Sequence, residues 1–219
     1  MSTPPKEFER FDIREKLLQF DSQRLRHKNA PWKGDRYVLV FFNKDLNYAD
    51  SDHHKRSVRI RNQPPQPHRW LPTLPHTPDV ETAKQRLLHV LSQTSFLQDR
   101  CSGLRIHPKY GNKRGTFISF GLTQSRKNRT KRRAQGLHTR KNANQNNAKY
   151  RQLFDALCVY VNAVSKDVFG VSDKCRFTSC IVAKNSQCEW HTDSGNIGPA
   201  ALMTLGSFRG GELLVEKSA

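Results

Sequence analysis

Two long polar stretches limit how much of this chain can enter a hydrophobic core. Residues 49–78 are rich in His, Arg and Pro, and residues 123–149 form a basic, low-complexity tract without an acidic residue. Neither stretch can bury enough apolar surface to fold by itself, so we expect both to be mobile insertions in a single domain spanning residues 1–219. The hydrophobic share of 35% and the mean hydropathy of −0.78 agree with a small ordered core.

The apolar residues outside these stretches fall into short runs. Runs that are rich in β-branched and aromatic residues and bounded by turn residues predict strands over residues 11–20, 36–42, 115–122, 177–182, 200–205 and 212–215. One helix is predicted to begin near Pro78–Asp79 with Asp79 as its N-cap, and another spans residues 150–164. This order favours an α+β fold, with helices on a β-sandwich or barrel.

The formal net charge of +19 favours a polyanionic partner, nucleic acid ahead of an anionic membrane surface. The alternative is a charge that serves solubility alone. No apolar run approaches the roughly 20 residues that cross a bilayer, and the N-terminus lacks the apolar segment of a secretory signal. The five cysteines form an odd set, which favours free thiols. We therefore expect an intracellular protein, nuclear or cytoplasmic, that does not enter membranes.

A potential metal-binding motif lies at residues 190–194. His191 and Asp193 are two positions apart, so at the end of a strand their imidazole and carboxylate leave the chain on the same side. Together with a second imidazole from a distant strand they would form a two-histidine, one-carboxylate set, which leaves open positions on Fe(II). A His-x-Asp pair alone is weak support, because it also occurs by chance in polar loops.

Zinc is the alternative metal, with Cys175, Cys180, Cys188 and His191 as ligands. Side-chain alternation along the predicted strand argues against this set, because it places Cys175 and Cys180 on opposite faces. Four other histidines lie in the Pro-rich stretch, where we expect solvent contact and not metal binding: His53, His54, His68 and His76.

The residues around His191 and Asp193 repeat the pattern of a known family. Residues 175–216 resemble the Fe(II)- and 2-oxoglutarate-dependent dioxygenases, particularly a protist, algal and viral branch with TET/JBP-like character. The matching positions are Asn185, Cys188, His191, Asp193, Asn196, Gly198, Pro199, Gly210, Gly211, Glu212 and Leu213. The resemblance implies a double-stranded β-helix core, jelly-roll or cupin-like, with flanking helices.

The remainder of the family pattern lies at the start of this chain. Its matches are Phe20-Asp21, His27, Pro31-Trp32-Lys33-Gly34, Arg36-Tyr37 and the run from Val38 to Phe42. When Ala219 is joined to Met1, His27 follows Asp193 by 53 positions, which is about the family spacing. The resemblance thus implies a circularly permuted domain. The alternative is a gene fragment with parts of two repeats, which needs two chains to complete a site.

The resemblance also implies roles for individual residues. His191, Asp193 and His27 would bind Fe(II), and Arg36 would bind the distal carboxylate of 2-oxoglutarate. The alternative for Arg36 is a salt bridge or a solvent-facing position on a strand. Many relatives have a serine two residues after this arginine, where this chain has Val38. Because a related algal branch uses ascorbate, that reductant stays open as a replacement for 2-oxoglutarate.

The expected reaction is hydroxylation of a C–H bond, with a nucleic-acid base as the first candidate substrate. Phosphate contacts are expected from the basic tract, which also fits a nuclear-import signal; its residues are Arg126, Lys127, Arg129, Lys131, Arg132 and Arg133, followed by Arg140 and Lys141. A base in a duplex would be flipped towards the metal and could stack on Trp32, Trp70 or Trp190, unless these belong to the core. The alternatives are a protein side-chain hydroxylase and a non-catalytic nucleic-acid-binding protein on a degenerate barrel.

Overall fold

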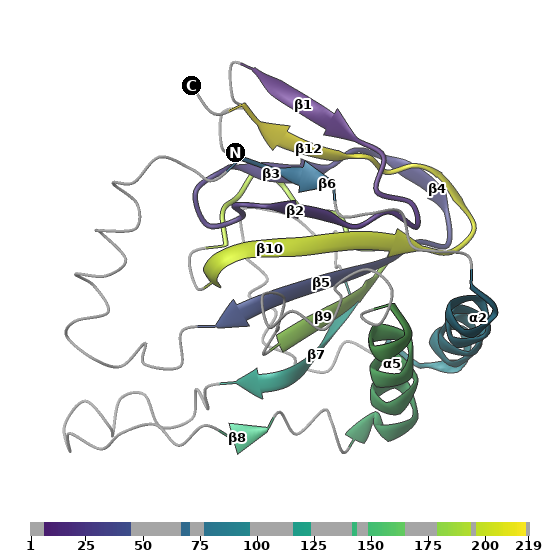
Figure 1. The fold of residues 1–219 in the computed structure, drawn as a ribbon. Helices are drawn as coiled ribbons and strands as arrows, with labels where there is room; N and C mark the ends of the chain where they lie inside the picture. The colour runs from purple at the N-terminus through teal and green to yellow at the C-terminus, as the bar shows by residue number, and fades with distance from the viewer. Residues whose placement is uncertain are drawn as a thin grey trace, which may run out of the picture.

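The described part of the chain is a mixed α+β fold of two helices and mostly antiparallel strands (Figure 1). The structure is a computed structural model, and it describes residues 7–44, 67–70, 77–96, 116–123, 142–143, 149–164, 179–193 and 196–217. Two sheets and a pair of helices form three layers, with the larger sheet in the middle. This confirms the coarse α+β prediction.

The larger sheet has seven strands in the order β6-β2-β10-β5-β9-β7-β8. Their bounds are β6 (Arg69–Trp70), β2 (Leu18–Phe20), β10 (Asn196–Leu205), β5 (Tyr37–Lys44), β9 (Ser179–Lys184), β7 (Thr116–Thr123) and β8 (Asn142–Ala143). A smaller sheet has the order β1-β12-β3, with β1 (Phe8–Phe11), β12 (Leu213–Glu216) and β3 (His27–Asn29). The short strands β4 (Trp32–Gly34) and β11 (Phe208–Gly210) pair with each other.

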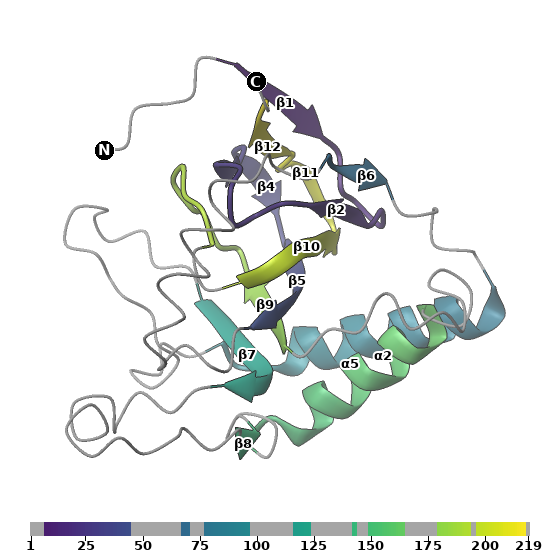
Figure 2. The ribbon, with the colours of Figure 1, turned by 60° about the vertical axis from the view of Figure 1, so that its left-hand side comes forward.

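Two helices, α2 (Pro78–Gln93) and α5 (Arg151–Val164), cover one face of the larger sheet (Figure 2). Leu87 and Leu157 are among the helix residues buried there, against sheet residues such as Met203. The N-cap of α2 is Thr77, whose Oγ1 accepts a hydrogen bond from the Val80 amide at 3.3 Å. The prediction of Asp79 as the cap was therefore wrong.

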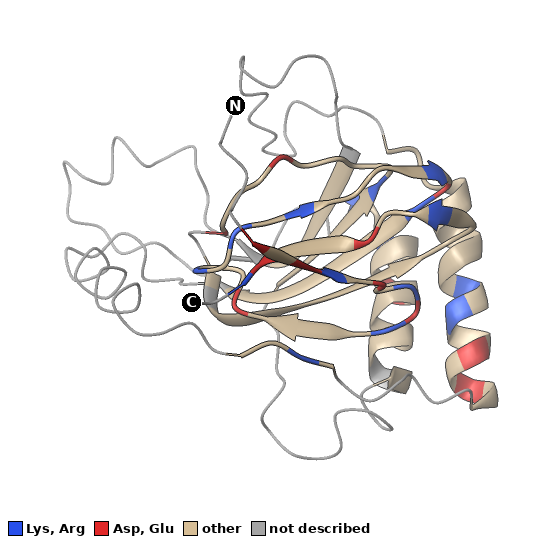
Figure 3. Ribbon diagram, turned by 90° about the horizontal axis from the view of Figure 1, so that it is seen from above, with Lys and Arg blue, Asp and Glu red and all other residues tan. Residues whose placement is uncertain are grey.

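Pro78 explains that cap, because proline is favoured at the first helical position, directly after the N-cap. Asp79 lies in the first turn of α2 instead, where a negative charge interacts favourably with the helix dipole. Figure 3 shows the acidic residues at this end of the helix, followed by basic ones.

The other face of the larger sheet packs against the smaller sheet. We call the buried cluster between them the inter-sheet core; it comprises Phe11, Ile13, Leu18, Phe20, Leu25, Val38, Phe42, Ala183, Ala200, Leu202, Leu213 and Val215. Successive residues of β10 alternate between the two layers, since Ala200 and Leu202 face the inter-sheet core while Ala201 and Met203 face the helices. This alternation decides which side chains can enter the space between the sheets.

The two ends of the chain meet in the smaller sheet. Strand β12 lies between β1 and β3, and Phe8 is the cross-strand partner of Glu216. The Lys217 amide donates to the Glu7 carbonyl at 3.2 Å. Both described helices are too short or too polar to cross a lipid bilayer.

Most of the predicted elements are present. The strands predicted over residues 36–42, 115–122, 200–205 and 212–215 correspond to β5, β7, β10 and β12, and the helix over 150–164 corresponds to α5. The single strand predicted over residues 11–20 is wrong, because β1 ends at Phe11 and β2 begins at Leu18. Glu15 between them has a φ of 53°, a left-handed conformation that interrupts a strand.

The two polar stretches lie largely outside the described residues. Residues 49–66, 71–76, 124–141 and 144–148 of the predicted insertions lie outside the described residues. Two short strands fall inside the predicted insertions: β6, which pairs with β2, and β8, which pairs with β7.

Candidate metal centre

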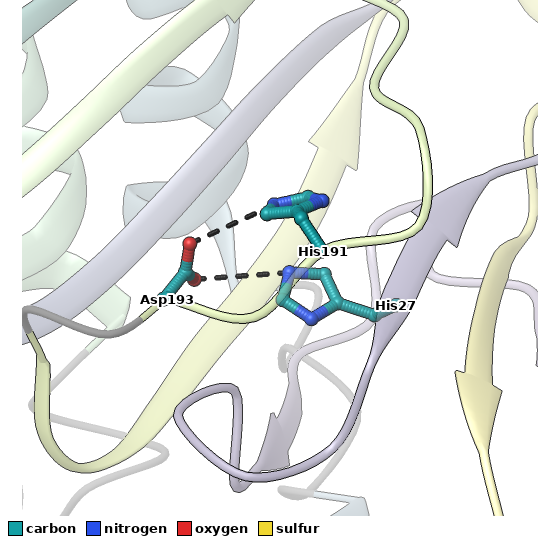
Figure 4. A group of neighbouring side chains, drawn as sticks. All are labelled: His27, His191 and Asp193. Atoms are coloured by element: carbon teal, nitrogen blue, oxygen red, sulfur yellow. Dashed lines mark ion pairs between the residues drawn. The ribbon is translucent and has the colours of Figure 1, made fainter. Parts of the chain in front are cut away.

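His27, His191 and Asp193 meet in one cluster, although 164 positions separate the two histidines (Figure 4). One potential ligand atom from each lies within 4.8 Å of the others. The Asp193 carboxylate lies 3.7 Å from Nε2 of His27 through Oδ2 and 3.6 Å from Nε2 of His191 through Oδ1. The structure thus brings together the three residues that the sequence nominated as metal ligands.

Backbone pairing places the two histidines side by side. His27 on β3 and His191 form an isolated antiparallel bridge, in which the His27 amide donates to the His191 carbonyl at 2.9 Å and the reverse bond measures 3.1 Å. Their rings are 4.3 Å apart between centroids. The Asp193 amide donates to the Ser22 carbonyl at 2.8 Å, which fixes the third residue to the N-terminal part of the chain.

Both imidazoles are oriented in the same way by the backbone. Nδ1 of His27 lies 3.2 Å from the Leu25 carbonyl, and Nδ1 of His191 lies 2.8 Å from the Glu189 carbonyl. An Nδ1–H that donates to these carbonyls leaves Nε2 as the potential ligand atom of each neutral imidazole. This second contact is the arrangement that metal-binding histidines use to fix their tautomer and ring orientation.

The two histidines have opposite pKa shifts. Burial lowers the pKa of His27 to about 4, with the nearby His191 acting in the same direction. Burial alone would also lower the pKa of His191, but the Cys188 thiol and the Asp193 carboxylate outweigh it and raise the value to about 9. At neutral pH the free protein therefore has a neutral His27 and a protonated His191.

Asn29 and Cys188 connect this cluster to Arg36. The Asn29 side-chain amide donates to Sγ of Cys188 at 3.5 Å, and its Oδ1 accepts from Nη2 of Arg36 at 3.2 Å. Asn29 follows His27 by two positions on β3, so both side chains leave the strand on the same side. The residue type of Asn29 does not indicate a role at the site. Its position two residues after His27 is the sequence feature that could have identified it.

Arg36 is a buried cation, with none of its surface exposed. Its Nη2 also donates to the Gly211 carbonyl at 3.0 Å, while Nε and Nη1 have no hydrogen-bond partner within the described structure. Burial lowers the pKa of Arg36 to about 10, so the group remains charged at neutral pH. Unused donors on a buried charged group indicate a place for an anion.

Aromatic rings and a glycine surround the Arg36 side chain. Its Cζ lies 5.3 Å from the ring centroid of Trp32 and 5.8 Å from that of Phe208. A Cβ at Gly211 would come within 2.9 Å of Nε, so only glycine leaves room for the guanidinium here. The burial of Arg36 contradicts the solvent-facing alternative for this residue. The salt-bridge alternative is not seen either, because Arg36 forms no ion pair with a described carboxylate.

The zinc set is not assembled in the described residues. Cys180 is buried in the core between sheet and helices, where burial raises its pKa, whereas His191 belongs to the cluster with His27 and Asp193. Cys175 lies outside the described residues. Of the two described cysteines of that set, Cys188, which contacts Asn29, lies beside the candidate site.

Other predicted residues take separate positions. Trp190 is buried against Ala30 and Leu214, whereas Trp70 is 45% exposed and packs edge-on against Phe11. His68 lies 3.3 Å from a Glu9 carboxylate oxygen and takes no part in the cluster. Outside the described residues are His53, His54 and His76, together with Arg126, Lys127, Arg129, Lys131, Arg132, Arg133, Arg140 and Lys141.

No protein-family model, curated protein or solved structure matches this chain.

Proposed function

We propose that this chain is an Fe(II)- and 2-oxoglutarate-dependent dioxygenase that hydroxylates a C–H bond, with a nucleic-acid base as its first candidate substrate. The observation that supports this most directly is the convergence of His27, His191 and Asp193 on one point. Two imidazoles and one carboxylate are the protein ligands of non-haem iron oxygenases, and they leave positions free for a co-substrate and oxygen.

The donor set fits a first-row metal ion. Two ligand atoms at about 2.1 Å from one ion and at right angles are about 3 Å apart. The carboxylate oxygens of Asp193 are 3.7 Å and 3.6 Å from the two Nε2 atoms, so a small inward movement closes the set. His27, His191 and Asp193 would bind the ion, and Fe(II) with a 2-oxo acid would supply the activation of oxygen for C–H hydroxylation.

The protein's own groups orient the reactants and control protons. His27 is neutral at neutral pH and offers its Nε2 lone pair without losing a proton first. His191 has a raised pKa, so metal binding there displaces a proton to solvent or to a neighbouring group. Arg36 offers Nε and Nη1 to the distal carboxylate of the co-substrate, and Asn29 lies between this arginine and Cys188, which flanks His191.

Nucleic acid is the proposed substrate because of the distribution of charge. The described residues contain 17 Lys and Arg against 13 Asp and Glu, which accounts for +4 of the net +19. The remaining +15 belongs to the other segments, foremost residues 124–141 with eight basic residues and no acidic one. A basic segment of this kind binds phosphate backbone without sequence preference and would bring bases to the metal centre.

We also propose that the two packed sheets form a circularly permuted double-stranded β-helix. In support, β12 and β1 are antiparallel neighbours, so a short hairpin could join Glu216 to Phe8. A chain in which Ala219 is linked to Met1, and which is opened between Lys44 and Pro67, would run in the order of the resembled family. Such a chain should retain Fe(II) binding, whereas loss of folding would contradict the permutation.

The decisive experiment titrates the metal-free protein anaerobically with Fe(II) and 2-oxoglutarate and records the visible charge-transfer band. We expect a band in the wild type that is lost in His27→Ala and His191→Ala. The matched control is His89→Ala, because His89 is an exposed histidine on α2. Arg36→Met should retain iron and need a much higher concentration of 2-oxoglutarate.

The possible results separate the alternatives. A band that survives in His27→Ala would contradict the three-residue site and point to another ligand or a second chain. Iron binding without a band would favour a different reductant such as ascorbate. If no iron binds, the non-catalytic alternative replaces the proposal. Mass spectrometry of DNA and RNA incubated with the iron-loaded protein then tests the substrate.

A further inference from the structure

Three buried side-chain polar atoms of the described structure lack a hydrogen-bond partner, and they belong to only two residues. They are Nε and Nη1 of Arg36 and Oγ1 of Thr204. Both residues have none of their surface exposed. A buried polar atom without a partner is costly to a fold, so such atoms often mark a position where a ligand or water completes the bonding.

Strand register brings these two residues onto one surface. Arg36 precedes Val38 by two positions, so both side chains leave the chain on the same face, and Val38 is the cross-strand partner of Thr204 on β10. Val38 and Leu202 belong to the inter-sheet core, and Thr204 shares the face of Leu202. The register therefore makes Arg36, directly before β5, a diagonal neighbour of Thr204 on β10, on the side of the inter-sheet core.

We propose that Thr204 is a second donor for the anionic ligand that Arg36 binds, and that it selects a ligand ending in a carboxylate. The inference rests on the proposed function, in which this group is the distal carboxylate of a 2-oxo dicarboxylic acid. The two oxygens of a carboxylate accept several hydrogen bonds. Two unused guanidinium nitrogens and one unused hydroxyl supply donors that would otherwise remain buried and unsatisfied.

Val38 explains why a hydroxyl from the neighbouring strand is needed. Val38 on β5 follows Arg36 by two positions, but valine has no hydrogen-bonding group. The residue directly opposite Val38 is Thr204, whose backbone is fixed on both sides: its amide donates to the Ile13 carbonyl and its carbonyl accepts from the Glu15 amide, both at 2.9 Å. The hydroxyl is therefore left for a contact inside the inter-sheet core.

The test compares Thr204→Val, which replaces the hydroxyl by a methyl group of similar size, with Thr204→Ser, which keeps it. Each full-length protein is loaded with Fe(II) anaerobically and titrated with 2-oxoglutarate and, separately, with pyruvate, which lacks the distal carboxylate. For Thr204→Val we expect the Kd of 2-oxoglutarate to rise about 10-fold, or about 1.4 kcal/mol. The Kd of pyruvate should stay unchanged, so discrimination between the two acids falls about 10-fold as well.

Two further variants separate a ligand contact from a structural effect. Thr204→Ser should bind 2-oxoglutarate close to the wild-type value, and Val38→Ser in the Thr204→Val background should restore most of the lost affinity by returning a hydroxyl to the partner position. The unfolding midpoint of Thr204→Val should equal or exceed that of the wild type, because the variant removes an unsatisfied buried hydroxyl.

The outcomes distinguish this inference from the proposed function. If Thr204→Val binds 2-oxoglutarate like the wild type while Arg36→Met binds it weakly, the role of Thr204 is overturned and the proposed function stands. If Thr204→Val weakens both acids equally, the effect is structural and the inference is again overturned. If the iron-loaded wild type does not bind 2-oxoglutarate, the proposed function and this inference fail together.

Discussion

The two histidines of the candidate metal centre come from regions with opposite properties. His27 lies on β3, with 5% of its side chain exposed. Its ring makes an edge-to-face contact with Phe20, with 5.0 Å between the ring centroids. His191 lies on the connection between β9 and β10, with 40% of its side chain exposed. The candidate site thus combines one histidine on a buried strand with another on an exposed connection.

The two histidines therefore differ in how firmly they are held and in how their protonation is controlled. The buried histidine is neutral because burial disfavours its charged form, and its ring packs against Phe20 of the inter-sheet core. The open histidine is protonated because a thiol and a carboxylate lie beside it. We infer that the β3 side provides a fixed ligand, whereas the connection provides ligands whose binding depends on pH and on neighbouring polar groups.

The largest expected effect comes from removing either histidine. His27→Ala and His191→Ala should each weaken Fe(II) binding by about 1000-fold, or about 4 kcal/mol, because each deletes one of three ligands. His27→Ala should also lower the free energy of unfolding of the metal-free protein at every pH, by about 2 kcal/mol from the cavity that it leaves in a buried site. The destabilisation by His191→Ala should instead vanish above the raised pKa of about 9. Urea unfolding at pH 10 measures this split, and equal destabilisation by both substitutions at that pH would erase the contrast.

The second effect is a dependence of stability on pH with a different window for each histidine. His27 has a folded pKa of about 4 and an unfolded value near 6.5, so between these values the unfolded chain binds a proton that the folded protein does not. The stability that His27 contributes is present above pH 6.5 and is lost as the pH falls towards 4, by up to about 3 kcal/mol. His27→Gln should remove this part of the acid sensitivity.

His191 has the opposite sign. Its folded pKa is raised to about 9, so its contribution to stability is fully present below pH 6.5 and is lost as the pH rises through 9. His191→Gln should therefore flatten the alkaline side of the stability profile, and it should also narrow the acid window, because the His191 charge helps to lower the pKa of His27. Chemical unfolding of the metal-free proteins from pH 4 to pH 10 measures both windows, and a His27→Gln profile that parallels the wild type would contradict the assignment.

The same contrast explains which parts of the molecule were predictable from sequence. Periodicity predicted β5, β7, β10 and α5, because each has a continuous pattern that local sequence determines. The His191 and Asp193 pair was also detectable, since both residues lie on one short segment. His27 required a resemblance to a family, because nothing near it in sequence indicates a ligand.

The residues that sequence missed depend on pairing between distant strands. Asn29 lies beside Arg36 and Cys188 because β3 pairs with β12 and with the bridge at His191. Thr204 lies opposite Val38 because β10 pairs with β5 across more than 160 positions of sequence. Such a register depends on the whole hydrophobic pattern and cannot be obtained from one segment.

A smaller effect is expected from loosening the tether of the open connection. Asn196 donates from Nδ2 to Oγ of Ser22 at 3.0 Å, and the same nitrogen lies 3.4 Å from Oδ2 of Asp193. Asn196→Ala should weaken Fe(II) binding about 10-fold, because contacts that orient a metal ligand typically contribute 10- to 100-fold. Gln85→Ala, at an exposed position on α2, is the control, and an equal loss there would contradict a specific role for Asn196.

The smallest effect should come from the thiol beside His191. Burial lowers the pKa of His191, and Cys188 contributes most to raising it, so Cys188→Ala should shift the pKa downwards. The proton then competes less with Fe(II) at pH 7, and the affinity should rise by about 2- to 5-fold, or under about 1 kcal/mol. NMR titration of the two imidazoles measures this directly: the His191 resonance should move while that of His27, which lies on the buried side, keeps a low pKa. A common shift of both histidines would mean that the two regions respond as one unit, and the division between a fixed ligand and a proton-controlled ligand would then have to be abandoned.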